Sequence, residues 1–416
     1  MEQKRIVLVS HNDRRGGAAI VTYRLMRTLQ SLGHEADMLV FEKTVDDPHV
    51  HLLGSGSARK YRFLKERLGI FCRNGFSRRQ LFKVSTGTTG MDIANHPLVA
   101  RADAIFLNWI NQATVSLSEI ARLGKLGKRI VWTMHDMWNM TGICHHAYSC
   151  CNYQEECGNC RYLGGMSGSR DLSHKIWSKK KELYGQTNIR FVAVSNWVKK
   201  CAQKSSLLRD KGVEVIHNAF PSELFPIESD RPLAEKFGGG KYKRVIAFGA
   251  AKLDDPVKGI SYAIEALNYL HDECSEDIEG AVAVFFGQMV DPNLFGELRF
   301  PHIACGTITS QEELHNLLVH SDVILSTSMY ETLGGTLIEG MSSGAVPVSF
   351  GEGGQVDIID HKETGYIAEY CNSRDVAEGI KWALRAGIDR RRQHAVVSER
   401  FDAVAIAMRY LELVED

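Results

Sequence analysis

The sequence lacks long apolar runs, an excess of charge of either sign and low-complexity segments. No stretch approaches the roughly 20 apolar residues of a membrane-spanning helix, and no signal peptide precedes the strand-like segment Ile6–Ser10. Lys plus Arg equals Asp plus Glu at 50 each, which argues against a general nucleic-acid-binding protein. These absences predict a cytoplasmic protein with no nucleic-acid partner.

A dinucleotide signature of the form GxGxxG is also missing after the first predicted strand, which disfavours an oxidoreductase. The ten cysteines are expected to be buried thiols, metal ligands or redox groups rather than disulfides, because the chain is expected to be cytoplasmic. What is present is a globular composition, with 44% apolar and 24% charged residues. A length of 416 residues exceeds one ordinary core and predicts two domains.

Short apolar runs alternate with helical patterns along the whole chain. The runs are mostly continuous, as in strands of a parallel sheet that is covered on both faces. The predicted strands are Ile6–Ser10, Asp37–Phe41, Asp103–Leu107, Arg129–Met134, Phe191–Ser195, Val213–Ile216, Arg244–Gly249, Ala281–Gly287, Ile303–Gly306, Asp322–Ser326 and Ala345–Ser349. This βα alternation predicts an α/β protein with doubly wound parallel sheets.

The alternation is interrupted between Asn218 and Lys241. This stretch contains three prolines and the run Gly238–Gly240, and a new strand begins at Arg244. We therefore expect a first domain over residues 1–222 and a second over residues 223–395. The last helix, about 396–416, is expected to return to the first domain.

The segment Ser326–Gly354, STSMYETLGGTLIEGMSSGAVPVSFGEGG, predicts a phosphate-binding turn. A strand ends at Ser326 and a helix is expected to begin near Gly335, so the first-turn amides are unpaired donors at the positive end of the helix dipole. A diphosphate fits there, between two carboxylates suited to binding sugar hydroxyls. These amides belong to Gly334, Gly335, Thr336 and Leu337, and the carboxylates to Glu331 and Glu339. The alternative is a glycine-rich turn with two solvated glutamates.

These residues resemble the family 4 retaining glycosyltransferases, whose E-x7-E signature corresponds to Glu331 and Glu339. The resemblance extends over nearly the whole chain, in the family's order and spacing. It includes RRGGAAIVTYRLMRTLQSLGHEADML, FVAVSNWVKK, VEVIHNAF, AFGAAKLDDPVKGISYAIEAL, SQEELHNLLVHSDVILSTS and GEGGQVDIID. It implies the GT-B fold, in which two Rossmann-like domains face each other across a cleft.

By this resemblance, Glu331 would contact the transferred sugar and Glu339 the ribose of the nucleotide. Lys252 and Lys258 would hold the diphosphate, and Gly17 would approach the phosphate from the first domain. Lys252 stands where the family usually has Arg, and Lys cannot make a bidentate grip.

The family pattern differs from this chain at two further places, because the loop before Lys258 is about one residue longer and Asp357 stands where Glu is common. The resemblance also implies that the nucleobase is contacted by backbone atoms, near Gly306 and Ile308.

His135, in VWTMHDMW, follows a predicted strand. Ligands of open α/β sheets bind at the carboxyl ends of strands, and the resemblance places a functional histidine here. We therefore expect His135 to align the sugar and the acceptor, although a structural histidine is the alternative. Asp136 either orients the imidazole ring or caps the following segment.

The segment CHHAYSCCNYQEECGNC has the cysteine pattern of a subset of these transferases from bacterial capsule and exopolysaccharide clusters. Four thiols with a terminal C-x2-C can form a structural zinc site. The expected ligands are Cys144, Cys150, Cys157 and Cys160, with Cys151 as an extra thiol and His145 and His146 as substitutes. A loop of reduced thiols or a disulfide remains the alternative. No carboxylate cluster suited to a catalytic metal is evident.

The segment between Arg59 and Lys83, the basic segment below, is rich in positive charge and in apolar residues. Its basic residues are Arg59, Lys60, Arg62, Lys65, Arg67, Arg73, Arg78, Arg79 and Lys83, against the single acid Glu66. Such a pattern fits a surface lying on anionic lipid. A solvated helix face is the alternative, and nucleic-acid binding would show the same sign.

Together these patterns predict a retaining glycosyltransferase that moves a sugar from a nucleotide diphosphate to a glycan or lipid-linked acceptor in bacterial polysaccharide biosynthesis. No metal is expected in catalysis. The alternatives are a nucleotide-sugar epimerase of the same fold and a non-catalytic sugar-nucleotide-binding subunit.

Overall fold

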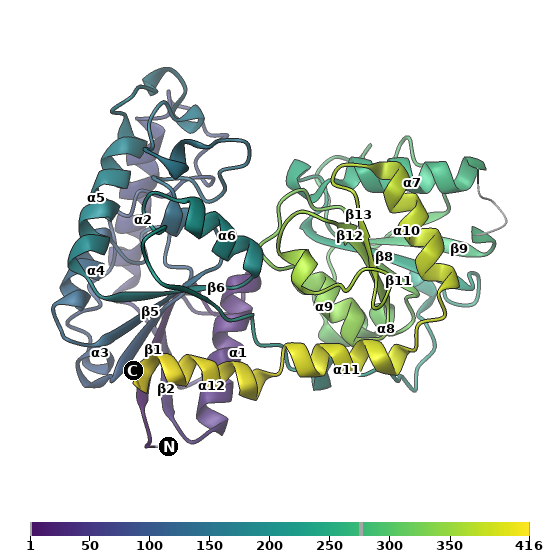
Figure 1. The fold of residues 1–416 in the computed structure, drawn as a ribbon, viewed down its shortest axis with the longest axis horizontal. Coiled ribbons are helices and arrows are strands. Elements are labelled where there is room, and N and C mark those ends of the chain that lie inside the picture. Colours follow the sequence, from purple (N-terminus) through teal and green to yellow (C-terminus); the bar gives the residue numbers. More distant parts are fainter. Residues whose placement is uncertain (1, 274–277, 416) are drawn as a thin grey trace. The chain divides into compact units, whose positions relative to one another are not determined.

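The computed structural model describes residues 2–273 and 278–415. They form two compact units (Figure 1). The first unit comprises the chain up to Ala219 together with the segment from Ala403, and the second comprises Phe220–Asp402. The limits expected from the sequence lie at 222 and 396.

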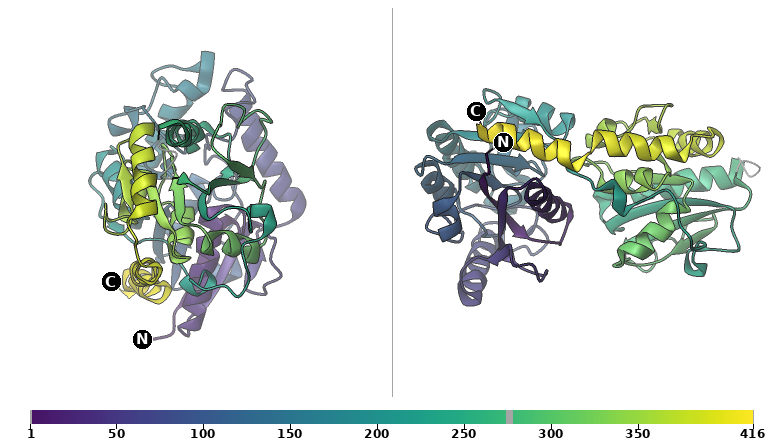
Figure 2. Two further views of the ribbon diagram at one scale, coloured as in Figure 1. Left: turned by 90° about the vertical axis from the view of Figure 1, so that its right-hand side faces the viewer. Right: turned by 90° about the horizontal axis from the view of Figure 1, so that it is seen from below.

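The first unit contains a seven-stranded parallel sheet in the order β3-β2-β1-β4-β5-β6-β7. Its strands are β1 Arg5–Asn12, β2 Glu35–Glu42, β3 Val50–Leu52, β4 Ala104–Leu107, β5 Arg129–Met134, β6 Ile189–Ala193 and β7 Val213–Val215. Its helices are α1 Gly17–Ser31, α2 Gly56–Phe71, α3 Pro97–Arg101, α4 Leu117–Gly124, α5 Leu172–Gln186, α6 Asn196–Lys204 and α12 Ala403–Glu415. Figure 2 shows helices on both faces of this sheet.

The C-terminal helix α12 belongs to the core of the first unit. Ile406 and Tyr410 pack in the same buried cluster as Phe106 of β4. The Tyr410 hydroxyl lies 2.9 Å from Thr133 Oγ1 of β5, so its polar end is hydrogen-bonded within the core, as burial requires. The chain therefore returns to its first sheet after building the second unit.

The second unit contains a six-stranded parallel sheet in the order β10-β9-β8-β11-β12-β13. Its strands are β8 Arg244–Lys252, β9 Ala281–Gln288, β10 His302–Ala304, β11 Val323–Ser326, β12 Val346–Phe350 and β13 Tyr366–Ala368. Its helices are α7 Ile260–Glu273, α8 Gln311–Val319, α9 Gly335–Ser342, α10 Ser373–Arg385 and α11 Arg390–Arg400. The prediction of two doubly wound parallel sheets is confirmed.

All eleven predicted strands overlap strands of the structure. The two that the sequence did not predict, β3 and β13, are three residues long and lie at sheet edges. The edge strands β7 and β10 are equally short and were predicted, so length alone does not explain the omission of β3 and β13.

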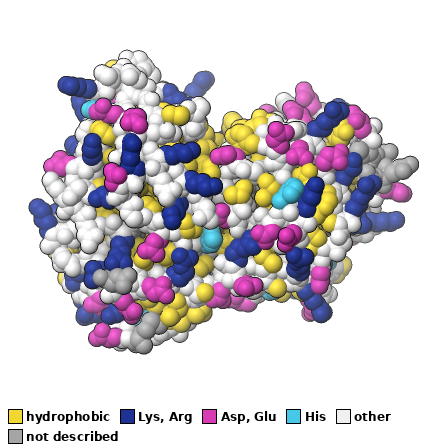
Figure 3. All heavy atoms as spheres, in the orientation of Figure 1, with side chains coloured by type: hydrophobic (Ala, Val, Ile, Leu, Met, Phe, Trp, Pro, Cys, Tyr) yellow, Lys and Arg dark blue, Asp and Glu magenta, His cyan; other side chains and the backbone are white. Residues whose placement is uncertain are grey.

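Charges of both signs are intermixed on the face shown in Figure 3, in keeping with equal totals of acidic and basic residues. Among the described residues, no helix combines the length and the apolar character needed to cross a bilayer. The basic segment is a local exception to the intermixing of charge along the sequence.

Candidate active site

In the second unit, the carboxyl end of β11 leads into a turn and then into α9, which begins at Gly335 as predicted. Gly334 precedes the helix with φ 109°, a left-handed conformation that favours glycine. The sequence therefore folds into a strand, a tight turn and a helix N-terminus, the arrangement that commonly binds phosphate.

One of the four predicted amide donors is already used. The Leu337 amide donates to Gly334 O at 3.0 Å, so the expectation that it is unpaired is wrong. The reason is that the first turn of α9 closes with a tight i to i+3 bond. Gly335 and Thr336 lie in that same first turn, and Glu339 lies one turn further along the helix.

Lys258 and Glu331, both predicted site residues, are brought together by the fold. Lys258 Nζ lies 2.9 Å from Glu331 Oε2, and both side chains remain partly exposed. Attraction by Glu331 raises the pKa of Lys258, against the opposing effect of burial. Lys258 therefore carries its positive charge at neutral pH beside a carboxylate that can accept hydrogen bonds from sugar hydroxyls.

The loop that carries Lys258 is hydrogen-bonded to the turn after β11. Thr327 Oγ1 donates to Gly259 O at 2.8 Å, and the Met329 amide donates to Val257 O at 2.8 Å. Gly259 has φ +62°, and a Cβ there would lie 2.1 Å from Thr327 O. Only glycine permits this approach, which sets the position of the neighbouring Lys258.

A second glycine-containing loop, after β12, contacts the backbone around Glu331. The Gly354 amide donates to Glu331 O at 2.8 Å, and a Cβ on Gly354 would lie 2.0 Å from Thr332 O. The buried amide of Gln355 donates to Ser328 O at 3.2 Å. The GEGGQ stretch thus supports the backbone that carries Glu331.

The remaining residues predicted to bind the nucleotide-sugar donor lie on separate elements. Lys252 lies at the end of β8, half exposed, with its Nζ 3.8 Å from Asp254 Oδ1. Gly306, with φ +67°, and Ile308 follow β10. In the first unit, Gly17 is the first residue of α1, and a Cβ on it would meet nothing within 4 Å. The space around Gly17 can therefore admit a group that approaches its backbone closely.

In the first unit, His135 directly follows β5, and its Nε2 lies 3.1 Å from Asn108 Oδ1 after β4. The carbonyl oxygen of Asn108 can only accept, so Nε2 carries the proton and Nδ1 is the acceptor. Burial lowers the pKa of His135 to about 4. At neutral pH the ring is uncharged and can accept a hydrogen bond from a hydroxyl.

Asp136 joins His135 to a buried polar network. Its Oδ2 accepts from Trp109 Nε1 at 2.7 Å and lies 2.7 Å from His145 Nδ1. Burial alone would raise the pKa of Asp136, but the attraction and hydrogen bond of His145 lower it to about 2. Asp136 also accepts from the Trp138 amide at 2.8 Å, so it both caps the following turn and anchors His145.

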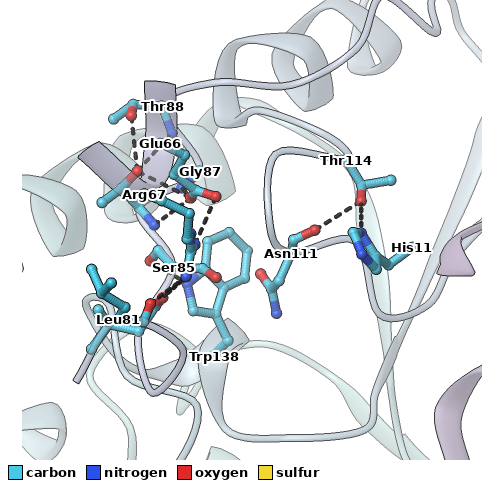
Figure 4. A network of polar contacts seen from close by, with 12 residues as sticks. His11, Glu66, Arg67, Leu81, Ser85, Gly87, Thr88, Asn111, Thr114 and Trp138 are labelled. Atoms are coloured by element: carbon cyan, nitrogen blue, oxygen red, sulfur yellow. Dashed lines mark hydrogen bonds and ion pairs between the residues drawn. The ribbon is translucent and has the colours of Figure 1, made fainter. Parts of the chain in front are cut away.

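Sequence reasoning missed His11, which lies at the end of β1 and enters the network shown in Figure 4. Thr114 Oγ1 donates to Asn111 O and lies 2.8 Å from His11 Nδ1, so His11 donates to Thr114. Burial, together with the nearby charge of Arg67, lowers the pKa of His11 to about 4. The sequence signal that could have identified His11 is a polar residue at the end of an apolar strand.

His145 lies in the cysteine-rich segment, but it contacts Asp136 rather than serving with the thiols. Its Nε2 lies 3.1 Å from Ser85 Oγ. Sequence reasoning offered His145 only as a substitute metal ligand, whereas the structure uses both ring nitrogens within the buried network. The segment therefore supports the turn that follows His135.

The four predicted zinc ligands lie near one another. Burial and the mutual proximity of the thiols raise the pKa of Cys144 to about 12 and those of Cys157 and Cys160 to about 11. The Gly142 amide donates to Cys157 Sγ at 3.2 Å. In the described part of the chain, no three His, Cys, Asp or Glu residues are arranged closely enough to hold a metal ion.

The basic segment forms α2 and the turns that follow it. Glu66 and Arg67 are buried and paired at 2.9 Å, so the expectation that Arg67 is part of a solvated or lipid-facing charge run is wrong. Arg67 donates to the backbone carbonyls of Leu81 and Val84 and fastens the turns to α2. The exposed large apolar residues of the segment are Tyr61, Leu64, Leu68, Phe76 and Phe82.

Solved structures, some of them named as glycosyltransferases, have the same two-sheet architecture over the whole chain. HepE of Anabaena, solved with UDP and glucose, has a TM-score of 0.65 at 16% identity and covers 99% of this chain and 100% of its own. A glycosyltransferase from Rickettsia africae has a TM-score of 0.66 at 18% identity, with coverage of 100% and 98%. The fold is therefore the GT-B fold of glycosyltransferases, as expected.

Family models extend this result to sequence. The model of Glycosyltransferase Family 4 matches residues 15–224, and that of Glycosyl transferases group 1 matches residues 235–395. The chain belongs to glycosyltransferase family 4.

A relative of Escherichia coli K12, WcaC, is named as a glycosyl transferase of colanic acid biosynthesis. It is 24% identical over 184 residues, which make up 43% of this chain and 44% of WcaC. The match thus spans less than half the length of that relative.

Proposed function

We propose that the chain is a retaining glycosyltransferase that moves a sugar from a nucleotide diphosphate onto a glycan or lipid-linked acceptor in bacterial polysaccharide biosynthesis. The observation that carries the proposal is the Lys258–Glu331 pair, at 2.9 Å, beside the N-terminus of α9. The UDP bound in the HepE structure supports a nucleotide-sugar donor. The name of WcaC supports a polysaccharide product.

In the proposed reaction, the bond between the anomeric carbon and the diphosphate oxygen breaks. A bond from the acceptor oxygen forms on the same face of the sugar, and the acceptor proton passes to the departing diphosphate. Lys258, Lys252 and the N-terminus of α9 neutralise the charge that develops on that diphosphate. Glu331 accepts hydrogen bonds from the sugar, and Glu339 accepts them from the ribose.

His135 is the proposed acceptor-side residue. Its uncharged ring has Nδ1 as the acceptor, because Nε2 donates to Asn108. A hydroxyl of the sugar or acceptor can therefore donate to Nδ1 without introducing a buried positive charge. The Asp136–His145 contact keeps the turn after β5 in place.

The direct test is to incubate the protein with a panel of nucleotide sugars and candidate acceptors and to determine the product by NMR. A new glycoside with the anomeric configuration of the donor supports the proposal, and an inverted product contradicts it. Exchange of a sugar hydrogen with solvent, without an acceptor, would instead identify an epimerase. Tight donor binding without any turnover would identify a binding subunit.

We further propose that Cys144, Cys150, Cys157 and Cys160 hold a structural zinc ion. Four zinc-bound thiolates would carry a net negative charge. Burial lowers the pKa of the fully buried Lys180 to about 7, and the nearby Cys157 and Cys144 oppose this lowering. Lys180 otherwise donates to the carbonyls of Trp138 and Thr141. Four cysteine thiols are a donor set that zinc commonly takes, and zinc binding requires them to draw closer together than they lie in the described structure.

The zinc proposal predicts about one zinc per chain after purification in reducing buffer. Cys160→Ser should lower both the metal content and the melting temperature, because structural zinc binding is coupled to folding. Cys151→Ser is the matched control within the same loop and should retain the metal. A folded, metal-free protein would leave the reduced thiols as the correct interpretation.

A lipid-linked acceptor would require the protein to reach a membrane surface. We propose that the basic segment lies on the anionic inner face of the cytoplasmic membrane, where lipid-linked acceptors are found. Exposed apolar side chains among basic ones support this contact. Vesicle binding that is equal on neutral and anionic lipid would contradict it.

A further inference from the structure

A pocket of about 840 Å³ lies between α2 and α5 of the first unit. Each helix contributes one face, because its lining residues recur at three- and four-residue spacing. The inner wall is the loop 86–89 together with Glu66, which Figure 4 shows beside Gly87 and Thr88. The volume is in the range of pockets that hold small molecules.

The rim of this α2–α5 pocket is positively charged. Lys65 comes from α2 and Arg73 from the turn that follows it, and Lys175 and Lys179 come from α5. Among the described residues, Glu66 is the one acid in the lining, and its buried carboxylate already accepts from Arg67 and from the Thr86 amide. In the described part of the chain no carboxylate forms an ion pair with these four cations, and Glu156 contacts the lining residue His174 instead. This excess of positive charge favours an anionic ligand.

The pocket also has apolar walls. Leu68 of α2 lines it, together with Leu172 and Ile176 of α5. Leu68 is 61% exposed, and Leu64 and Tyr61, on the same side of α2 at one- and two-turn spacing, are 54% and 64% exposed. An apolar stripe thus runs along α2 into the cationic rim, and a free phosphate or sugar phosphate would leave this stripe in water.

We propose that the α2–α5 pocket binds the phosphate headgroup of an anionic phospholipid, while Tyr61, Leu64 and Leu68 enter the acyl layer. The proposal rests on the membrane contact proposed above and adds to it a defined pocket and the lysines of α5, which lie about 100 positions beyond the basic segment in the sequence. Lysine side chains suit this role because their stems lie along apolar surface while their charged ends reach phosphate.

The test is sedimentation of the full chain with vesicles of phosphatidylcholine alone or mixed with phosphatidylglycerol. Lys175→Gln with Lys179→Gln should weaken binding to the anionic vesicles about 25-fold, since each basic residue near an anionic surface contributes about fivefold. The matched control is Lys181→Gln with Lys200→Gln, two exposed lysines outside the pocket. This control should bind within about twofold of the parent chain if the pocket, rather than total charge, matters.

A second arm separates lipid from free phosphate. Short-chain phosphatidylglycerol, kept below its micelle concentration, should protect the chain in thermal-shift measurements, whereas glycerol phosphate should not. Leu68→Gln should reduce the lipid effect, because it removes part of the apolar wall and keeps every charge. Equal responses to the lipid and to glycerol phosphate, or equal vesicle binding by the two double variants, would overturn the pocket proposal.

Failure of the pocket and failure of the wider membrane contact are distinguishable. If the α5 double variant binds like the parent while replacement of Arg78, Arg79 and Lys83 by Gln weakens binding, the basic segment contacts lipid and the pocket does not.

Discussion

Lys258 Nζ lies 2.9 Å from Glu331 Oε2, although the two residues are 73 positions apart in the sequence. The pair brings together a cation suited to a diphosphate and a carboxylate suited to a sugar, at the start of α9. Lys258 donates a hydrogen bond to Glu331. When a nucleotide sugar binds, the Lys258 ammonium would contact both its phosphate and the Glu331 carboxylate.

Lys258→Met should therefore weaken donor binding or transfer by roughly 10- to 150-fold, the effect of losing one charge-assisted hydrogen bond. Lys381→Met is the matched control, since it breaks a comparable pair with Glu378 at 3.1 Å on α10. Isothermal titration with nucleoside diphosphates and a transfer assay check the prediction. Equal losses in both variants would mean that the effect is one of stability alone.

Gly259→Ala should displace the Lys258 loop, because a Cβ would lie 2.1 Å from Thr327 O and φ is +62°. We expect a loss of donor affinity of about tenfold or more. Gly212→Ala is the control, since a Cβ there meets nothing within 4 Å. Retention of full donor affinity by Gly259→Ala would show that the loop position is unimportant.

His135 should remain uncharged throughout the neutral range, because burial lowers its pKa to about 4. The stability linked to His135 is fully present above the ordinary histidine pKa of about 6.5. It is lost as pH falls from there towards 4, because in this interval the unfolded chain takes up the proton and the folded chain does not. NMR of the imidazole, assigned with His135→Gln, measures this directly. A titration midpoint near 6.5 would contradict the burial of the ring.

Asp136 should stabilise the folded chain as a carboxylate whose pKa is lowered on folding. Its pKa is lowered to about 2, so the contribution is present above the ordinary value of about 3.9 and is lost as pH falls towards 2. A shift of this size corresponds to about 2.6 kcal/mol. Urea unfolding from pH 7 to pH 3 should show about half of this loss in the parent chain and none of it in Asp136→Asn. Parallel curves would argue against the His145 contact.

The sequence predicted most of the fold, because long apolar strand runs and a glycine-rich strand-to-helix turn are local signals. Gly335 begins α9 as expected, since the turn chemistry of Gly334 is also local. The three-residue edge strands β3 and β13 escaped prediction, whereas the equally short edge strands β7 and β10 did not.

Long-range polar contacts were the main gap. His11 reaches Thr114 across 103 positions, and Trp109 reaches Asp136 across 27. No sequence spacing reveals such partners, because they meet only at the carboxyl edge of the assembled sheet. Arg67 shows the same limit, since a run of charge in sequence does not indicate which member is buried.

The most direct test of the proposed transferase is a comparison of Glu331→Gln with Glu339→Gln in donor binding and in transfer rate. Glu331→Gln should slow transfer by about tenfold or more while the nucleoside diphosphate binds nearly as before, because this carboxylate is assigned to the sugar. Glu339→Gln should mainly weaken binding of the nucleotide, because its carboxylate is assigned to the ribose. Transfer at the parent rate by Glu331→Gln, with unchanged donor affinity in both variants, would contradict the assigned donor site.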